Sequence, residues 1–358
     1  MTVSMRLGGV MARNSVYDDL RVFALGQSNH TKNYKKSVQR WFRTITDDAH
    51  FSFARHVERT FPDSVPYVKA EENVRGKDVY VISSLYDDRQ CVENRILGES
   101  VSDKFTKLIF FCNSLYDASA DRITVIIPYD GFSRQDRKTE SRAPVYTKYV
   151  AQQIEVSHVA RVLTMDIHNL AAFQNANRIQ SDNLEAKNLF VDWCEQRIES
   201  PADDEYVVLS PDSGGMGRTR RFRDALKARW GVKVGIAYLD KERVRGEVHG
   251  DNIIGEVEGR KVFIIDDIIA SGKSIAKCEK VLGEKGADLY AVFATHGLFV
   301  GQANKFLANI KRLVITDTVD PYRLDDSFRD RLEVLETSKI FAQAIRRTHV
   351  GDSLSELL

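Results

Sequence analysis

The sequence has few cysteines, and no two of them are close enough to form a local metal site. Its 358 residues include four cysteines, namely Cys91, Cys112, Cys194 and Cys278, and no C-x-x-C motif. This spacing indicates neither a zinc site nor a disulfide framework. Isolated thiols are typical of a reducing compartment, so we expect a cytoplasmic protein.

The sequence also lacks an excess of charge and long apolar runs. Lys and Arg number 52 and Asp and Glu 51, which gives a formal net charge of +1. This balance does not favour general binding to nucleic acid or to a membrane surface. No apolar run is long enough to cross a bilayer. We therefore expect no nucleic-acid partner and no membrane partner.

The sequence contains only 7 prolines and no low-complexity linker. A chain of this length, with 43% hydrophobic residues, is enough for two domains, and we expect them to pack against each other. The first seventeen residues contain Arg6 and Arg13 and no acid. They indicate an accessory N-terminal extension or, alternatively, an organelle transit segment.

Short apolar runs alternate with segments of helical period, such as 145–155 and 274–286. Continuous Val and Ile runs of this length are typical of parallel strands that are covered on both faces. The repeated order predicts an α/β fold with parallel sheets, and the pattern occurs twice along the chain. The expected strands are at 79–82, 123–128, 161–166, 205–210, 261–266, 290–295 and 312–317.

Two aspartates follow the expected strand at 261–266, and a turn and a helix come after them. Asp266 and Asp267 would lie at the carboxyl end of a strand, where open α/β sheets bind ligands. Adjacent carboxylates are suited to the hydroxyls of a ribose or to Mg²⁺, although a pair that only caps a helix is the alternative. Gly272 and Lys273 resemble the end of a P-loop, but Asp267 stands where that motif needs a glycine.

Three further polar stretches follow expected strands. Asp212, Gly214 and Gly215 form a turn before a helix, where Asp212 could hold a metal and Arg218 could face phosphate oxygens. A basic loop at 134–142 suits a polyphosphate, or is simply solvated. His168 is either a metal or phosphate contact or a structural residue. The charged stretch 237–252 indicates a mobile loop that closes over a reaction, or a solvated hairpin.

Together these stretches resemble the ribose-phosphate pyrophosphokinase (phosphoribosyl pyrophosphate synthetase) family over about residues 58–358. The matching segments occur in the same order as in that family. They include ENVRGKDVYVI, IPYDGFSRQDRK, SRAPVYTKYVA, VLTMDIH, VVLSPDSGG, LDKER, VFIIDDIIASG and QAIRRTHVGDSLSELL. The start of the chain is less similar, with only GQSNH at 26–30 matching an early turn of the family.

The resemblance implies two phosphoribosyltransferase-like α/β domains with ATP and a sugar phosphate between them. The expected division is an extension at 1–20, an ATP-side domain at 21–186, a sugar-phosphate domain at 187–334, and a C-terminal segment at 335–358 whose helix packs on the first domain. The resemblance also implies a homo-oligomer, from dimer to hexamer, that uses Mg²⁺. The implied reaction transfers the β,γ-diphosphoryl group of ATP to the anomeric hydroxyl of ribose 5-phosphate and releases AMP.

The resemblance also implies a role for each matching residue. Lys241 and Arg243 would be catalytic, and the metal ligands would be His168 and Asp212. The ATP contacts would be Phe61, Asp63, Arg134, Gln135, Asp136 and His168. The sugar phosphate and diphosphate would be bound by Asp212, Gly214, Gly215, Asp266, Asp267, Ser271, Gly272, Lys273 and Ser274.

The sequence departs from the family pattern at three places. Val65 stands where the adenine-side motif has Glu, and residues 84–100 form an insertion that we interpret as a long loop or a helix. Lys273 replaces the second glycine of the 5-phosphate turn. Because a cation there suits a phosphate diester or a diphosphate, a larger acceptor such as ADP-ribose is an alternative. A nucleobase phosphoribosyltransferase and a non-catalytic regulatory paralogue are further alternatives.

Overall fold

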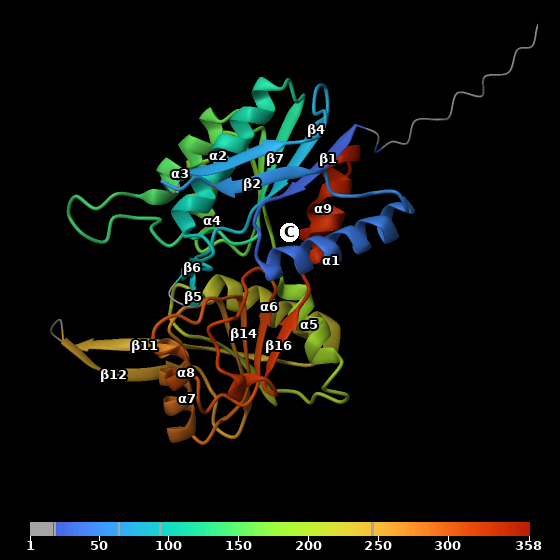
Figure 1. Ribbon diagram of the computed structural model, residues 1–358. Helices are drawn as coiled ribbons and strands as arrows, with labels where there is room; N and C mark the ends of the chain where they lie inside the picture. The colour runs from blue at the N-terminus through green and yellow to red at the C-terminus, as the bar shows by residue number, and fades with distance from the viewer. Residues whose placement is uncertain (1–16, 18, 64, 93–94, 245–246) are drawn as a thin grey trace, which may run out of the picture.

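The computed structural model describes residues 17, 19–63, 65–92, 95–244 and 247–358, and the side chains of 92–97 and 241–251 lie outside that description. The expected N-terminal extension therefore falls almost entirely outside the described residues. Figure 1 shows two halves, each built around its own sheet, stacked one above the other. The predicted α/β class with parallel sheets is confirmed.

The N-terminal half contains a five-stranded parallel sheet in the order β1-β4-β7-β8-β9. Its strands are β1 (Leu20–Ala24), β4 (Asp78–Ile82), β7 (Arg122–Ile127), β8 (Arg161–Met165) and β9 (Gln180–Leu184). Helices α2 (Val101–Asp117), α3 (Tyr146–Val156) and α4 (Leu170–Ala176) share one buried apolar cluster with the sheet. Helices α1 (Asn29–Thr46) and α9 (Ser338–Val350) share another with its opposite face. Cover on both faces explains why these strands are continuous apolar runs.

The C-terminal half contains a seven-stranded sheet in the order β12-β11-β10-β13-β14-β15-β16, in which only β11 and β12 pair antiparallel. Its strands are β10 (Tyr206–Ser210), β11 (Gly235–Val244), β12 (Glu247–Ile254), β13 (Lys261–Ile269), β14 (Asp288–Gly297), β15 (Leu313–Thr316) and β16 (Leu332–Leu335). Its helices are α5 (Lys187–Glu195), α6 (Met216–Trp230), α7 (Lys273–Glu284) and α8 (Ala303–Phe306), with a 3-10 turn at Asp326–Phe328. A second 3-10 turn at Ser355–Leu357 follows α9 at the end of the chain.

Two short hairpins complete the N-terminal half: β2 (His56–Thr60) with β3 (Pro66–Ala70), and β5 (Gln90–Val92) with β6 (Arg95–Leu97). The second hairpin lies in the insertion at 84–100. The interpretation of this insertion as a helix is therefore wrong, because its backbone pairs with itself as strands. The stretch 237–252 also forms a hairpin, β11–β12, which projects from the side of the C-terminal half in Figure 1.

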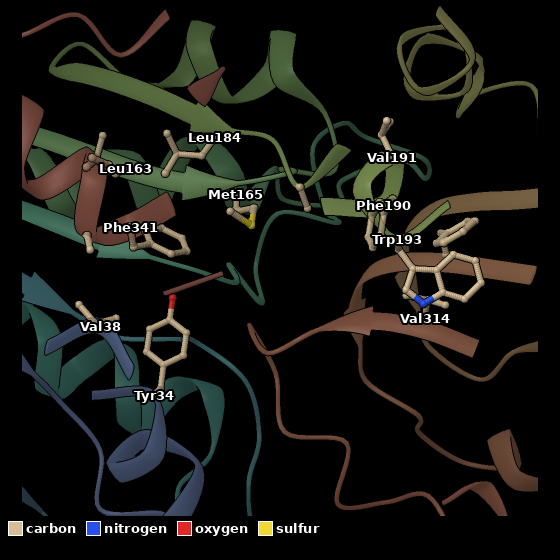
Figure 2. Close-up of a cluster of buried hydrophobic side chains, with 14 of the residues drawn as sticks. Tyr34, Val38, Leu163, Met165, Leu184, Phe190, Val191, Trp193, Val314 and Phe341 are labelled. Carbon is tan, nitrogen blue, oxygen red and sulfur yellow. The ribbon is translucent and has the colours of Figure 1, made fainter. Parts of the chain in front are cut away.

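The chain ends on the N-terminal half, where α9 packs along α1 (Figure 1). The hydroxyl groups of Tyr34 and Thr337 lie 3.1 Å apart, and those of Ser37 and Ser338 lie 2.8 Å apart. One buried apolar cluster joins this contact to the C-terminal half. Figure 2 shows it passing from Val38 and Phe341 through Leu184 to Phe190 and Val314. The two halves thus share part of their core.

A buried histidine also connects the two sheets. His296 on β14 is 2% exposed, and its Nε2 lies 3.1 Å from the carbonyl oxygen of Met165 on β8. Because a carbonyl only accepts, Nε2 must carry the proton, which leaves Nδ1 to accept from the hydroxyl of Thr318 at 2.8 Å. Burial lowers the pKa of His296 to about 4, so the ring is neutral near pH 7.

We expect the protein to lose stability from this histidine as the pH falls. The pKa drops from an ordinary 6.5 to about 4, so the loss begins below pH 6.5 and continues through pH 4. At about 1.4 kcal/mol per pKa unit, it amounts to about 3 kcal/mol. The measurement is the free energy of unfolding from pH 7 to pH 4 for the protein and for His296→Gln. A constant difference between the two across this range would contradict the prediction.

Candidate active site

A polar cleft of about 510 Å³ lies where the two halves meet at the carboxyl ends of their strands. This is the position at which open α/β sheets bind ligands. Eight of the residues predicted from the sequence line it together: Arg134, Asp136, His168, Asp212, Gly214, Gly215, Asp266 and Asp267. They come from four separate loops or strand ends, so the fold gathers residues that are up to 133 positions apart (Arg134 to Asp267).

Asp267 is the central contact of the cleft, since it links the two halves. Its carboxylate Oδ2 lies 2.7 Å from Nδ1 of His168, and its Oδ1 lies 3.2 Å from Nη1 of Arg218. Burial opposes the charge on Asp267, but Arg218 and His168 outweigh it and lower its pKa. The hydrogen bond to Asp267 in turn raises the pKa of His168. Nε2 of His168 remains available to a ligand.

Asp266 has the opposite electrostatic situation. Burial, and then the neighbouring carboxylate of Asp267, raise its pKa well above the ordinary range for an aspartate. Strand β13 continues through both aspartates to Ile269, whereas the sequence placed them at the end of the strand. The two carboxylates are therefore held by a hydrogen-bonded strand.

Asp166 turns the chain into the cleft at the end of β8. It adopts a left-handed backbone conformation, with φ of 41°, which is uncommon for a residue other than glycine. Its Oδ2 accepts hydrogen bonds from the amide of Ala186 at 3.0 Å and from the hydroxyl of Thr295 at 2.6 Å. These two contacts stabilise the turn that places His168 in the cleft.

The turn after β10 forms the opposite wall. The amide of Gly215 donates to Oδ1 of Asp212 at 3.0 Å, and the hydroxyl of Ser210 donates to the carbonyl oxygen of Asp212 at 2.6 Å. A Cβ at position 215 would lie 2.4 Å from Oγ of Ser210, so a side chain there would displace the Ser210 hydroxyl from its bond to Asp212. The turn ends at the N-terminus of α6, whose free N–H groups suit an anion.

Several predicted site residues lie elsewhere. Phe61 and Asp63 are exposed at the tip of the β2–β3 hairpin, with the guanidinium of Arg59 5.1 Å from the ring centre of Phe61. Gln135 is exposed beside the cleft but does not line it. The turn from Ser271 through Gly272 and Lys273 to Ser274 starts α7 and does not line it either. The side chains of Lys241 and Arg243 on β11 lie outside the described part of the structure.

Gly272 is required by the turn before α7. Its φ of 75° is left-handed, and a Cβ there would lie 2.7 Å from Cγ of Leu307. Lys273 and Ser274 follow it and are both exposed at the start of the 12-residue helix. A cation therefore stands at a helix N-terminus, where a phosphate would be attracted by both.

The sequence did not indicate Asn169 and Asn183, which also line the cleft. Asn169 donates from Nδ2 to Oδ2 of Asp136 at 2.6 Å, and Asn183 accepts from the amide of Ile167 at 2.7 Å. Arg218 was expected to face phosphate oxygens, but its Nη1 faces the two carboxylates of β13. In the sequence, its position three residues after Gly215 had indicated only that it lies near the cleft.

The described side chains contain no cluster of three or more His, Cys, Asp or Glu residues that could hold a metal ion. Asp212 and His168 nevertheless line one cleft. Among the described residues, Oδ2 of Asp212 and Nε2 of His168 make no hydrogen bond. Two protein ligands suit an ion that also takes water and substrate oxygens.

Within the described residues, no helix combines the length and the apolar character needed to span a membrane.

Three family models match the sequence. They are the N-terminal domain of ribose phosphate pyrophosphokinase over residues 35–157, the phosphoribosyl transferase domain over 180–297, and the phosphoribosyl synthetase-associated domain over 243–358. The last two matches overlap at 243–297, and together the three cover residues 35–157 and 180–358.

Similar proteins give the same result. A ribose-phosphate pyrophosphokinase of Hyphomonas neptunium is 33% identical over 317 residues, which cover 87% of this chain and 94% of that protein. Ribose-phosphate pyrophosphokinase 1 of Streptococcus pneumoniae is 32% identical over 346 residues, 95% of this chain and 97% of that protein. The crystal structure of phosphoribosylpyrophosphate synthetase from Mycobacterium smegmatis shares the fold, with a TM-score of 0.75 at 24% identity over 93% of this chain and 99% of that chain. The resemblance is confirmed, and the chain belongs to the ribose-phosphate pyrophosphokinase family.

Proposed function

We propose that the protein transfers the β,γ-diphosphoryl group of ATP to the anomeric hydroxyl of ribose 5-phosphate, with Mg²⁺, and releases AMP. The main support is the cleft itself. It joins cationic side chains, a glycine turn and a carboxylate pair in one cavity of about 510 Å³ between the two halves. A nucleotide polyphosphate and a sugar phosphate need these three kinds of contact at once.

The residues in and around the cleft have proposed tasks. Arg134, Gln135, Asp136 and His168 would contact ATP from the N-terminal half. Gly214 and Gly215 would approach the diphosphate through their backbone amides, and Asp266 and Asp267 would accept hydrogen bonds from ribose hydroxyls. The turn from Ser271 to Ser274 would hold the 5-phosphate. The division of the chain at residues 186 and 334 is part of the same proposal.

His168 and Asp212 would hold the metal ion. Their unused atoms, Nε2 and Oδ2, are of a kind that a divalent cation accepts together with phosphate oxygens. A bound Mg²⁺ would supply neutralisation of phosphate charge. The protein would hold that site in place through Asp267, which fixes the ring of His168.

The reaction is an in-line displacement at phosphorus. The anomeric oxygen forms a bond to the β-phosphorus, the bond from that phosphorus to the α,β-bridging oxygen breaks, and AMP leaves with that oxygen. The hydroxyl proton of the sugar passes to solvent water as the new bond forms. Lys241 and Arg243, two residues apart on β11, would neutralise the negative charge that develops.

We also propose a homo-oligomer, from dimer to hexamer. Phe61 and Asp63 are expected to contact adenine, yet they lie exposed at the tip of a hairpin and do not line their own chain's cleft. A second copy that brought this hairpin to the cleft would complete the ATP site.

Localisation to the cytoplasm remains a prediction.

The deciding experiment compares two acceptors. We expect incubation with ATP, Mg²⁺ and ribose 5-phosphate to give phosphoribosyl pyrophosphate and AMP, identified by mass. ADP-ribose is the second acceptor, because Lys273 suits a phosphate diester. A faster reaction with ADP-ribose would replace ribose 5-phosphate in the proposal. If neither acceptor led to the release of AMP, a regulatory, non-catalytic role would be favoured.

A further inference from the structure

Arg218 lies within ion-pair distance of the carboxylate pair of the cleft and has no role in the proposed function above. It lies in the first turn of α6, three residues after Gly215, and its side chain is only 14% exposed. Its Nη1 is 3.2 Å from Oδ1 of Asp267 and 3.5 Å from Oδ1 of Asp266. One guanidinium nitrogen therefore approaches both carboxylates.

This arrangement answers an electrostatic problem of the site. Two carboxylates on consecutive residues repel each other, and the repulsion grows where water is excluded. The positive charge of Arg218 offsets this repulsion. In addition, Nδ1 of His168 lies 2.7 Å from Oδ2 of Asp267. A guanidinium is planar and permanently charged, so it can hold two carboxylates in a fixed relative orientation.

The guanidinium also has a hydrogen-bond donor without a partner among the described residues. This donor is the buried Nε. Leaving a buried donor unpaired costs about 1–3 kcal/mol, which a purely stabilising ion pair would not retain without need. Arg218 as a residue lines the cleft, although this nitrogen is itself buried.

We propose that Arg218 is a positioning residue, which orients the carboxylates of Asp266 and Asp267 toward two hydroxyls of the acceptor ribose. This inference rests on the proposed function and adds a specificity determinant to it. Acceptors that carry both hydroxyls would depend on Arg218, whereas ATP, bound by the opposite wall, would depend on it much less. The affinity for an acceptor that lacks one hydroxyl, such as 2-deoxyribose 5-phosphate, would therefore depend less on Arg218.

The test compares Arg218→Gln and Arg218→Lys with the unchanged protein. In Arg218→Gln we expect the KM for ribose 5-phosphate to rise about 10- to 100-fold, as for other residues that orient a ligand-binding group, and the KM for ATP to change much less. Arg218→Lys keeps the charge but not the planar group, so it should recover part of the loss. The matched control is Arg220→Gln, an exposed arginine on the same helix.

A second measurement tests whether Arg218 acts through the carboxylate pair. The double variant Arg218→Gln with Asp266→Asn removes one of the two repelling charges, and we compare its affinity for ribose 5-phosphate with that of Asp266→Asn alone. If Arg218 acts through the pair, its loss should cost less there than in the unchanged protein. Equal costs in both backgrounds, or a matching rise in the KM for ATP, would overturn the inference. Failure of the unchanged protein to use ribose 5-phosphate would instead contradict the proposed function.

Discussion

Asp267→Asn is expected to reduce kcat/KM for ribose 5-phosphate at least about a hundredfold, as loss of a preorganised polar contact commonly does. The carboxylate would lose its charge, and with it the contact to Arg218 and the orientation of His168. The proposed contact to a ribose hydroxyl would weaken as well. Steady-state kinetics with varied ribose 5-phosphate provide the measurement.

The control for this prediction is an aspartate outside the cleft. Asp288→Asn removes an exposed carboxylate at the start of β14, and its kinetics should match those of the unchanged protein. Because Asp267 is only 3% exposed, thermal unfolding should be followed in parallel. A folded Asp267→Asn protein with more than about a tenth of the original kcat/KM would remove Asp267 from the site.

Lys241→Ala is expected to reduce kcat about a hundredfold or more, while the dissociation constant for ATP changes much less. The reason is that a cation on the β11–β12 hairpin would stabilise charge that appears in the transition state and is weaker in bound ATP. Turnover is measured under saturating substrates, and ATP binding is measured at equilibrium. The split between the two quantities identifies a transition-state contact.

Lys233→Ala is the control, since this exposed lysine lies just before the other end of the same strand. It should leave both quantities unchanged. If Lys241→Ala weakened ATP binding as much as it lowered kcat, Lys241 would be a nucleotide-binding residue and not a catalytic one. The hairpin would then serve to bind ATP.

The sequence predicted the fold well because its strands are buried on both faces. Each of the seven apolar runs, from 79–82 to 312–317, corresponds to a strand of the structure, and the helices expected at 145–155 and 274–286 are also confirmed. The strand boundaries differ by one to three residues, and the difference at β13 bears on the site. Strand β13 passes through Asp266 and Asp267 because its backbone continues to pair with β14 as far as Ile269.

The connections within the cleft were not predictable from the sequence. The contact between His168 and Asp267 joins residues 99 positions apart, and neither has a neighbouring signal that points to the other. The left-handed turn at Asp166 depends on Thr295, from the other half of the chain. The insertion at 84–100 has no long apolar period, so its short β5–β6 hairpin could not be distinguished from a loop or a helix.

The shared apolar cluster has a consequence for dissecting this protein. Val38 and Phe341 belong to the same buried cluster as Phe190 and Val314 (Figure 2), so a cut between β9 and β10 would expose hydrophobic surface on both fragments. The last helix would also be separated from α1, its neighbour in space. Fragments made at that point would tend to aggregate. Because each fragment carries part of the shared cluster, the native fold would form only when both fragments are refolded together.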